Sequence, residues 1–168
     1  MTIRGLALVV SILVFSVSTA TGQGTQVPFS GLQHDSSLPV EVASDQLDLN
    51  QADGTATFSG NVVIGQGDMR ITAAKVEVFY APQSNNSSGQ ISKMIATGGV
   101  TVVNGDEAAE AEKAVYSVVN ATITMTGNAM LTQGKNALSS EKMTINLDSG
   151  TATMDGRVRS ILQSGTNE

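Results

Sequence analysis

Few side chains in this sequence could do covalent chemistry. Its single histidine is His34, and it has no cysteine. With one histidine near the N-terminus, no Ser-His-Asp set and no Gly-x-Ser-x-Gly turn can be assembled. Paired carboxylates could serve a glycosidase, but Asp45, Asp48 and Asp53 do not lie on the apolar phase described below and so lack a pocket. We therefore expect a protein that is not an enzyme and that needs no cofactor.

Two further stretches could in principle hold a cation. The run Asp106–Glu112 contains four acidic residues, and a solvated loop is the simpler interpretation of it. Gly65-Gln66-Gly67-Asp68 resembles part of a calcium-binding β-roll repeat, but it occurs once, without tandem copies. The related Gln133-Gly134-Lys135 indicates that this position is a turn. We expect no metal site.

The elements that would position any site follow from an internal repeat. Its anchor glycines are Gly60, Gly98, Gly127 and Gly156, in the passages FSGNV, ATGGV, MTGNA and MDGRV. The last two spacings are both 29 residues (127 − 98 and 156 − 127), and the first is 38 (98 − 60). The nine additional residues have a natural place in the polar stretch 81–89. A fixed period of this size predicts stacked supersecondary units.

Apolar side chains alternate with polar ones around each glycine. The first repeat has Ala56, Phe58, Val62 and Ile64 at offsets −4, −2, +2 and +4, and most odd offsets are polar. Period-2 alternation predicts strands with one apolar and one wet face. The fold class is therefore all-β, built from many short antiparallel strands.

The two ends of the chain lack the repeat and differ from it in composition. Residues 1–22 look like a cleaved signal peptide, because the apolar stretch Leu6–Val17 is too short to span a bilayer, which needs about 20 residues. An uncleaved membrane anchor is the alternative. Residues 23–39 are expected to be a disordered lead-in, 40–162 the folded domain and 163–168 a flexible tail.

Composition excludes two classes of ligand. The formal net charge is −6 and no Lys/Arg cluster could neutralise a run of phosphates, so nucleic acid is not an expected partner. Tryptophan is absent and aromatic residues make up 4%, which leaves little for stacking on sugars. Without cysteine, the fold has to be held by burial and by ladder hydrogen bonds.

The apolar positions of this alternation, which we call the inward stripe, leave two interpretations open. Four of the seven methionines lie on it, and methionine suits both gap-filling and adaptable apolar surfaces. The stripe is either an ordinary packed core or an apolar groove that accepts flexible hydrocarbon chains. Small residues such as Ala96 and Ala129 on the same stripe leave room that a tight core would normally fill.

One stretch of the first repeat carries a family resemblance. Residues 56–78 resemble the signature F-x-G-N-V-x-V-x-Q-G-x-x-x-I-x-A-D-K-V of the OstA-like family of periplasmic lipopolysaccharide transport proteins, and the resemblance extends over about residues 40–159. Ala74 departs from the signature, which has aspartate there. The matching positions are Phe58, Gly60, Asn61, Val62, Ile64, Gln66, Gly67, Ile71, Ala73, Lys75 and Val76.

The resemblance implies an elongated, twisted β-jellyroll of about sixteen short antiparallel strands with an open apolar groove. In that family the groove holds the acyl chains of lipopolysaccharide, and copies stack head to tail between inner-membrane and outer-membrane partners across the periplasm. The groove would then be lined by the inward residues Leu47, Leu49, Phe58, Val62, Ile64, Val76, Val78, Met94, Val100, Val102, Tyr116, Ile123, Met125, Leu131, Met143, Ile145 and Met154.

Three expectations complete this interpretation. Arg70 and Lys75 could meet phosphates at the groove rim, or could simply be surface charges. Strand addition is expected at the edges near residues 40–49 and 152–162, where no proline protects the C-terminal edge. The alternatives are a structural β-solenoid that polymerises around a dry core and a membrane-tethered adaptor of the same transport system.

Overall fold

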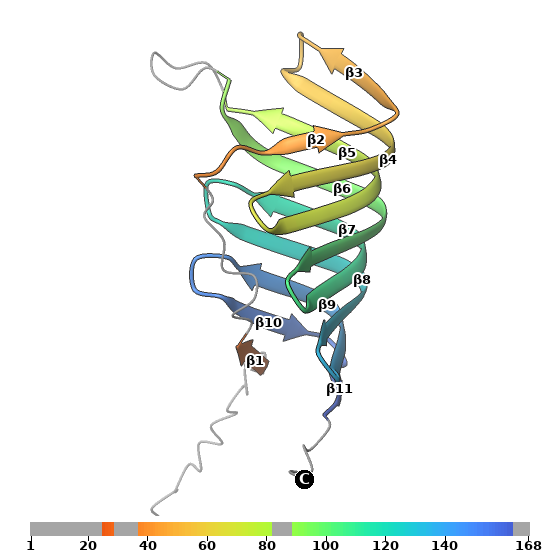
Figure 1. Ribbon diagram of the computed structural model, residues 1–168, viewed down its shortest axis with the longest axis vertical. Helices are drawn as coiled ribbons and strands as arrows, with labels where there is room; N and C mark the ends of the chain where they lie inside the picture. Colours follow the sequence, from red (N-terminus) through yellow and green to blue (C-terminus); the bar gives the residue numbers. More distant parts are fainter. Residues whose placement is uncertain (1–24, 29–36, 82–88, 163–168) are drawn as a thin grey trace, which may run out of the picture.

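The computed structural model describes residues 25–28, 37–81 and 89–162, and the regular structure of these residues is antiparallel β-sheet (Figure 1). Consecutive strands from β4 to β10 are neighbours, so the sheet is a meander that stacks along the long axis of the molecule. The strands are β1 Thr25–Pro28, β2 Glu41–Ala43, β3 Gln46–Asn50, β4 Thr55–Gln66, β5 Met69–Tyr80, β6 Ile91–Asn104, β7 Glu107–Ser117, β8 Thr122–Gln133, β9 Asn136–Asn146, β10 Thr151–Asp155 and β11 Arg159–Ile161.

The six long strands, β4 to β9, each bend in the middle. The bends form a column along one side of the molecule, and the hairpin turns lie on the opposite side (Figure 1). The sheet is thereby folded into two facing layers. The first layer contains β3, β10 and the half-strands 55–59, 75–80, 91–97, 113–117, 122–126 and 142–146; the second contains β2, β11 and the half-strands 62–66, 69–73, 100–104, 107–111, 129–133 and 136–140.

In β4, β6 and β8 the bend is a β-bulge at an anchor glycine. In β8 the pairing with β9 shifts between Thr126 and Ala129, which leaves one additional residue on β8. Gly127 has φ 83° and Asn128 has φ 51°, a left-handed pair that glycine and asparagine tolerate. A Cβ on Gly127 would lie 2.8 Å from the Cβ of Glu112. The repeated glycine is therefore required by both backbone conformation and space.

The two layers enclose one apolar core. Side chains at offsets −4, −2, +2 and +4 from Gly60, Gly98 and Gly127 point into it, and most are less than 5% exposed. Alternation places them within each half-strand; β4, β6 and β8 keep the same phase across the bulge, whereas in β5, β7 and β9 the inward phase shifts by one residue at the bend. The core runs along the stacking axis without interruption.

The strand count differs from the expected sixteen short strands. The described residues form eleven strands, because each long strand continues through its bend with ladder pairing on both sides. The acidic run 106–112 is also not the solvated loop we expected. Apart from Asp106 in the turn, it lies in β7, and Glu107 is buried, since it alternates in phase with the inward Ala109 and Ala111.

The C-terminal edge differs from expectation as well. β1, from the segment expected to be a disordered lead-in, pairs with β10 and brings Pro28 opposite Thr151. The prediction that no proline lies at this edge is therefore wrong. A pairing between residues more than 120 positions apart leaves no mark in a local repeat.

Some expectations concern residues outside the described part of the chain. These are the signal peptide 1–22, the tail 163–168 and His34. Within the described residues there is no helix that is long and apolar enough to cross a membrane.

Candidate functional site

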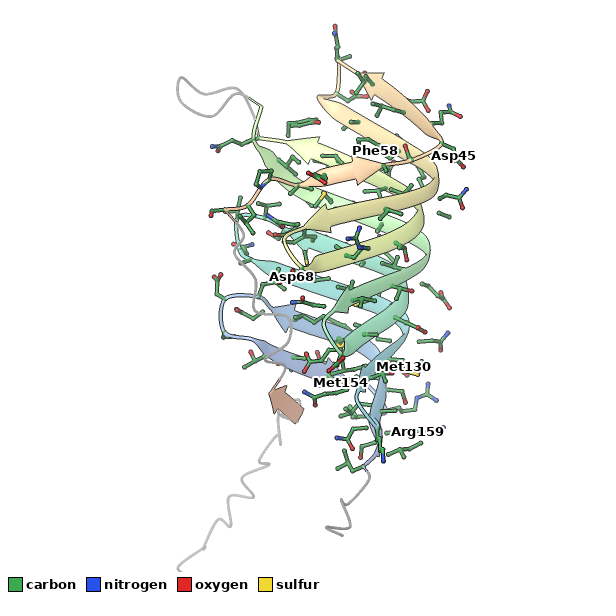
Figure 2. The ribbon with its side chains drawn as sticks, in the orientation of Figure 1. Asp45, Phe58, Asp68, Met130, Met154 and Arg159 are labelled. Carbon is green, nitrogen blue, oxygen red and sulfur yellow. The ribbon has the colours of Figure 1, made fainter. Side chains whose placement is uncertain are left out.

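The candidate site is the interior between the two layers, since the inward side chains gather there. Phe58 lies toward its N-terminal end and Met154 toward its C-terminal end (Figure 2). Phe58 is partly buried against the core. Fourteen of the seventeen predicted groove residues are at most 3% exposed: Val62, Ile64, Val76, Val78, Met94, Val100, Val102, Tyr116, Ile123, Met125, Leu131, Met143, Ile145 and Met154.

The middle of the interior is filled by protein side chains. Met125, Leu131, Met143 and Ile145 have no exposed surface. Because the layers touch here, the structure does not show the open groove that the resemblance implies. Five core methionines, including Met69 and Met94, make this packing adaptable, since an unbranched thioether chain can repack.

The N-terminal end of the interior is open. Leu47 and Leu49 of β3 lie on the inward phase, opposite Phe58 and Ala56, but are 49% and 70% exposed. The cause is geometric, because β3 is the outermost strand of its layer and β2 covers only three residues of the facing layer. Predicted groove residues therefore occur in two states, buried in the middle and exposed at this end.

The C-terminal end carries apolar surface too. Val158 is 39% exposed, and Ile161 and Leu162 are both 68% exposed. Val158 lies two residues after Gly156, on the inward phase, whereas Ile161 of β11 lies opposite Ala137 and has the outward phase. Both ends of the stack thus present apolar side chains where the two layers stop.

Polar side chains line the interior on the side of the hairpin turns. Gln66, Asn104 and Gln133 each lie six residues after an anchor glycine, and the first two are buried. Tyr116 Oη donates a hydrogen bond to Gln66 Oε1 at 3.1 Å, and Gln133 donates to Glu107. We call the margin where the two layers meet beside the turns the seam.

The contact between Tyr116 and Gln66 joins the two layers, since Tyr116 lies in the first layer and Gln66 in the second. Gln66 Nε2 in turn donates to the carbonyl oxygen of Leu38 at 2.9 Å. Burial, and secondarily the charge of Asp148, raises the pKa of Tyr116 above 10.0, so the phenol stays protonated as a donor. Sequence reasoning missed these seam residues, although the even offset of Gln66, Asn104 and Gln133 signals that they point inward.

The bends carry carboxylates on the outer face. Asn61 donates to Asp45 at 2.8 Å, Asn128 donates to Glu112 at 2.9 Å, and Arg157 pairs with Glu141 at 2.8 Å. Asp45, Glu112 and Glu141 directly precede Gln46, Lys113 and Lys142, respectively, each of which lies 15 residues after an anchor glycine or at the equivalent position before the first one. These contacts hold neighbouring strands together at the bend. At the remaining anchor glycine, Gly98, Ala74 stands in the place of the acid.

The two predicted rim cations lie apart. Lys75 is at the bend, and its Nζ is 3.2 Å from Glu77, with both side chains partly exposed. Arg70 is exposed beside the β4–β5 turn, on the side of the seam where Asp68 lies (Figure 2). The structure does not bring them into one cluster.

The alternative sites from the sequence have no structural support. Asp45, Asp48 and Asp53 are exposed and lie outside the interior. Gly67 and Asp68 form the β4–β5 turn, and Gly67 has φ 57°, which confirms the turn interpretation. In the described ranges, no group of three His, Cys, Asp or Glu side chains could hold a metal ion.

Comparison with known proteins supports the interpretation of the fold. The chain matches a curated protein of Rhizobium meliloti strain 1021, an uncharacterized protein, with 30% identity over 113 residues. This match covers 66% of the chain and 61% of the relative. The lipopolysaccharide export system protein LptA of Escherichia coli K12 matches with 36% identity over 52 residues, which is 31% of the chain and 28% of that protein.

A solved structure has the same fold. It is the crystal structure of LptH, the LptA-homologous periplasmic component of the lipopolysaccharide transport device of Pseudomonas aeruginosa. It superposes with a TM-score of 0.68 at 18% identity and covers 77% of this chain and 99% of its own. At this identity the likeness establishes the fold alone.

A family profile matches residues 41–151, from β2 to the start of β10. The matched region includes the whole interior except its C-terminal end. The family is one of transport proteins and not of enzymes. The chain belongs to the LptA/(LptD N-terminal domain) LPS transport protein family.

Proposed function

We propose that this protein is a periplasmic carrier and bridge subunit for lipopolysaccharide. The acyl chains lie between the two layers, and copies stack head to tail between inner-membrane and outer-membrane partners. The observation that carries the proposal is the continuous apolar interior, which reaches both ends of the stack and is exposed at each. No step requires catalysis, since the work is the removal of hydrocarbon from water at about 25 cal/mol per Å².

Lipid uptake requires the layers to move apart in the middle of the interior. The bends at the anchor glycines are suited to act as hinges, because each contains two residues in the left-handed conformation. The hydrogen bond between Tyr116 and Gln66 opposes separation, and its loss costs about 1 kcal/mol. Arg70, on the side of the seam, is better placed than Lys75 to meet an anionic head group that stays outside.

Stacking is supported by the polarity of the edge strands. β4 and β10 run in the same direction, because six antiparallel pairings separate them. β3 of a second copy would therefore be antiparallel to β10, and β2 would be antiparallel to β11. Two copies in the same orientation can thus continue both layers, in a heterologous contact that propagates. Leu47 and Leu49 would then lie on the same inward side as Val158 across the junction.

Photo-crosslinking tests the site of lipid binding. A photoreactive residue is introduced at Phe58, Ile64, Met125 or Ile145, and at the outward Thr57 as the control. We expect crosslinks to lipopolysaccharide or lipid A from the inward positions and none from Thr57. Crosslinks from Thr57 alone would contradict binding in the interior.

A dry polymer remains the second candidate. Zero exposure of Met125, Met143 and Ile145 favours it, since a filled core needs no ligand. The two candidates share the stacking but differ in the crosslinking result. Assembly without any crosslink from Met125 or Ile145 would establish the structural polymer in place of the carrier.

A further inference from the structure

The outermost strand of the first layer at the C-terminal end comes from the other end of the chain. β1 pairs antiparallel with β10, with Thr25 opposite Met154 and Val27 opposite Ala152. In Figure 1, β1 lies beside β10 at the lower end, whereas β2, the next strand in sequence, lies near the upper end. The chain therefore covers its own last edge with its first strand.

The register of this pairing matches that of β3 on β4. There, Leu47 is opposite Phe58 and Leu49 is opposite Ala56. Phe58 and Met154 both precede their anchor glycine by two residues, and Ala56 and Ala152 precede it by four. Val27 thus has the register position of Leu49, and Thr25 that of Leu47.

The polarity matches too. β4 and β10 run in the same direction, and β3 and β1 are each antiparallel to their partner. β1 consequently occupies on β10 the position, direction and register that β3 has on β4. A second copy that extended the first layer with the repeat unbroken would place its own β3 there.

We propose that β1 is an intramolecular cap on the stacking edge, which β3 of the next copy has to displace. This inference rests on the head-to-tail stacking proposed above. It assigns to residues 25–28 a regulatory role, since a capped chain can extend only from its N-terminal end. Pro28 disfavours the addition of a further strand to β1, because proline has no backbone N–H to donate.

The cap is built to be displaceable. β1 has four residues and places Thr25 and Val27 where β3, with five residues, places two leucines.

A reversible covalent lock tests the cap in one protein. The sequence has no cysteine, so Gln26→Cys with Thr153→Cys, which lie directly opposite each other, gives a unique disulfide. Sedimentation velocity over a concentration series measures assembly of the full mature chain. We expect the oxidised form to stay monomeric at concentrations at least ten-fold above those at which the reduced form assembles.

Deletion of residues 25–28 is the complementary variant, with deletion of residues 165–168 as the control of equal length. We expect the first deletion to lower the concentration needed for assembly at least ten-fold and the control to leave it unchanged. Equal assembly of the capless and native chains, or of the oxidised and reduced forms, would overturn the cap. Disulfide-linked dimers in place of linked monomers would also overturn it, because β1 would then lie on a neighbouring copy.

The outcomes separate the cap from the stacking on which it depends. If the native and capless chains assemble equally, stacking holds and the cap is wrong. If neither assembles at any concentration, the proposed stacking itself is wrong and the cap falls with it.

Discussion

The middle of the stack and its N-terminal end are built from the same alternation but have opposite exposure. In the middle, Met125 and Ile145 are completely buried. At the N-terminal end, Leu47 and Leu49 have the same inward phase and are 49% and 70% exposed. The residue types are comparable, so the difference comes from the number of neighbouring strands.

This difference shows how one stripe can serve two purposes. Where a strand has neighbours on both sides and a facing layer, its inward side chains stabilise the fold. Where the stack stops, the same side chains form an apolar surface that a second copy or a lipid chain can cover. At an end of the stack, inward side chains that would be core residues in the middle are therefore left uncovered.

The largest expected effect is the contrast between a middle and an end truncation. Met125→Ala should lower the free energy of unfolding by about 2–5 kcal/mol, because it removes buried contacts and leaves a cavity. Leu49→Ala, on the exposed end, should lower it by less than about 1 kcal/mol. Urea unfolding of both variants measures the contrast. Equal losses would mean that the N-terminal end is packed as well as the middle.

An acidic substitution at the end should affect assembly and leave the fold intact. Leu49→Asp should weaken self-association about ten-fold, or about 1.4 kcal/mol, because it places a charge where apolar surface would be buried. Sedimentation velocity measures the change.

The control for this variant is Val119→Asp. Val119 is 80% exposed but lies between β7 and β8, away from both ends. We expect no change in its assembly. If both variants weakened assembly equally, a general charge effect and not the end surface would be responsible.

Much of the middle was predictable from the sequence. Offsets from the anchor glycines place Met94, Met125 and Met154 inside, and the structure confirms this, because strand phase is a local property. The family and the antiparallel β class also follow from local patterns. The exposure of side chains was predicted least well at the two ends of the stack, because it depends there on the absence of a further neighbouring strand.

Two features could not be obtained from the repeat. The pairing of β1 with β10 depends on the three-dimensional position of both chain ends. The packed state of the interior depends on whether facing layers touch, which alternation leaves open. The seam was a different failure, because Gln66 and Asn104 carried the inward phase but were polar, and only apolar positions were considered.

A smaller effect concerns the contact that holds the layers together in the middle. Tyr116→Phe removes the hydrogen bond to Gln66 and should lower the free energy of unfolding by about 1 kcal/mol at pH 7. Tyr80→Phe, at an exposed tyrosine, is the matched control and should change it little.

The difference in the free energy of unfolding between the native chain and Tyr116→Phe should depend on pH. The pKa of Tyr116 is raised above 10.0 in the folded state by burial and by Asp148, so folding favours the protonated phenol. The resulting stabilisation is complete below about pH 10 and is lost as the pH rises through the raised value. The native chain should therefore lose its advantage over Tyr116→Phe in urea unfolding above about pH 10. A constant difference from pH 7 to pH 11 would contradict this assignment.

The smallest expected effect lies at the bend between the two regions. At Gly98 and Gly99 the acid found at the other three anchor glycines is replaced by Ala74. Ala74→Asp with Gly99→Asn would recreate the contact seen between Asp45 and Asn61, and nothing lies within 4 Å of a Cβ on Gly99. Asparagine tolerates the positive φ there, as it does at Asn61.

We expect this double variant to raise the free energy of unfolding by about 0.5 kcal/mol, measured by urea unfolding. Gly99→Asn alone should not raise it, because the side chain then has no acid to bind and the left-handed backbone still disfavours it. If the acid at a bend stiffens the hinge, the double variant should also capture lipid A more slowly than the native chain. An equal capture rate with raised stability would assign the bend carboxylates to folding and exclude them from the opening of the layers.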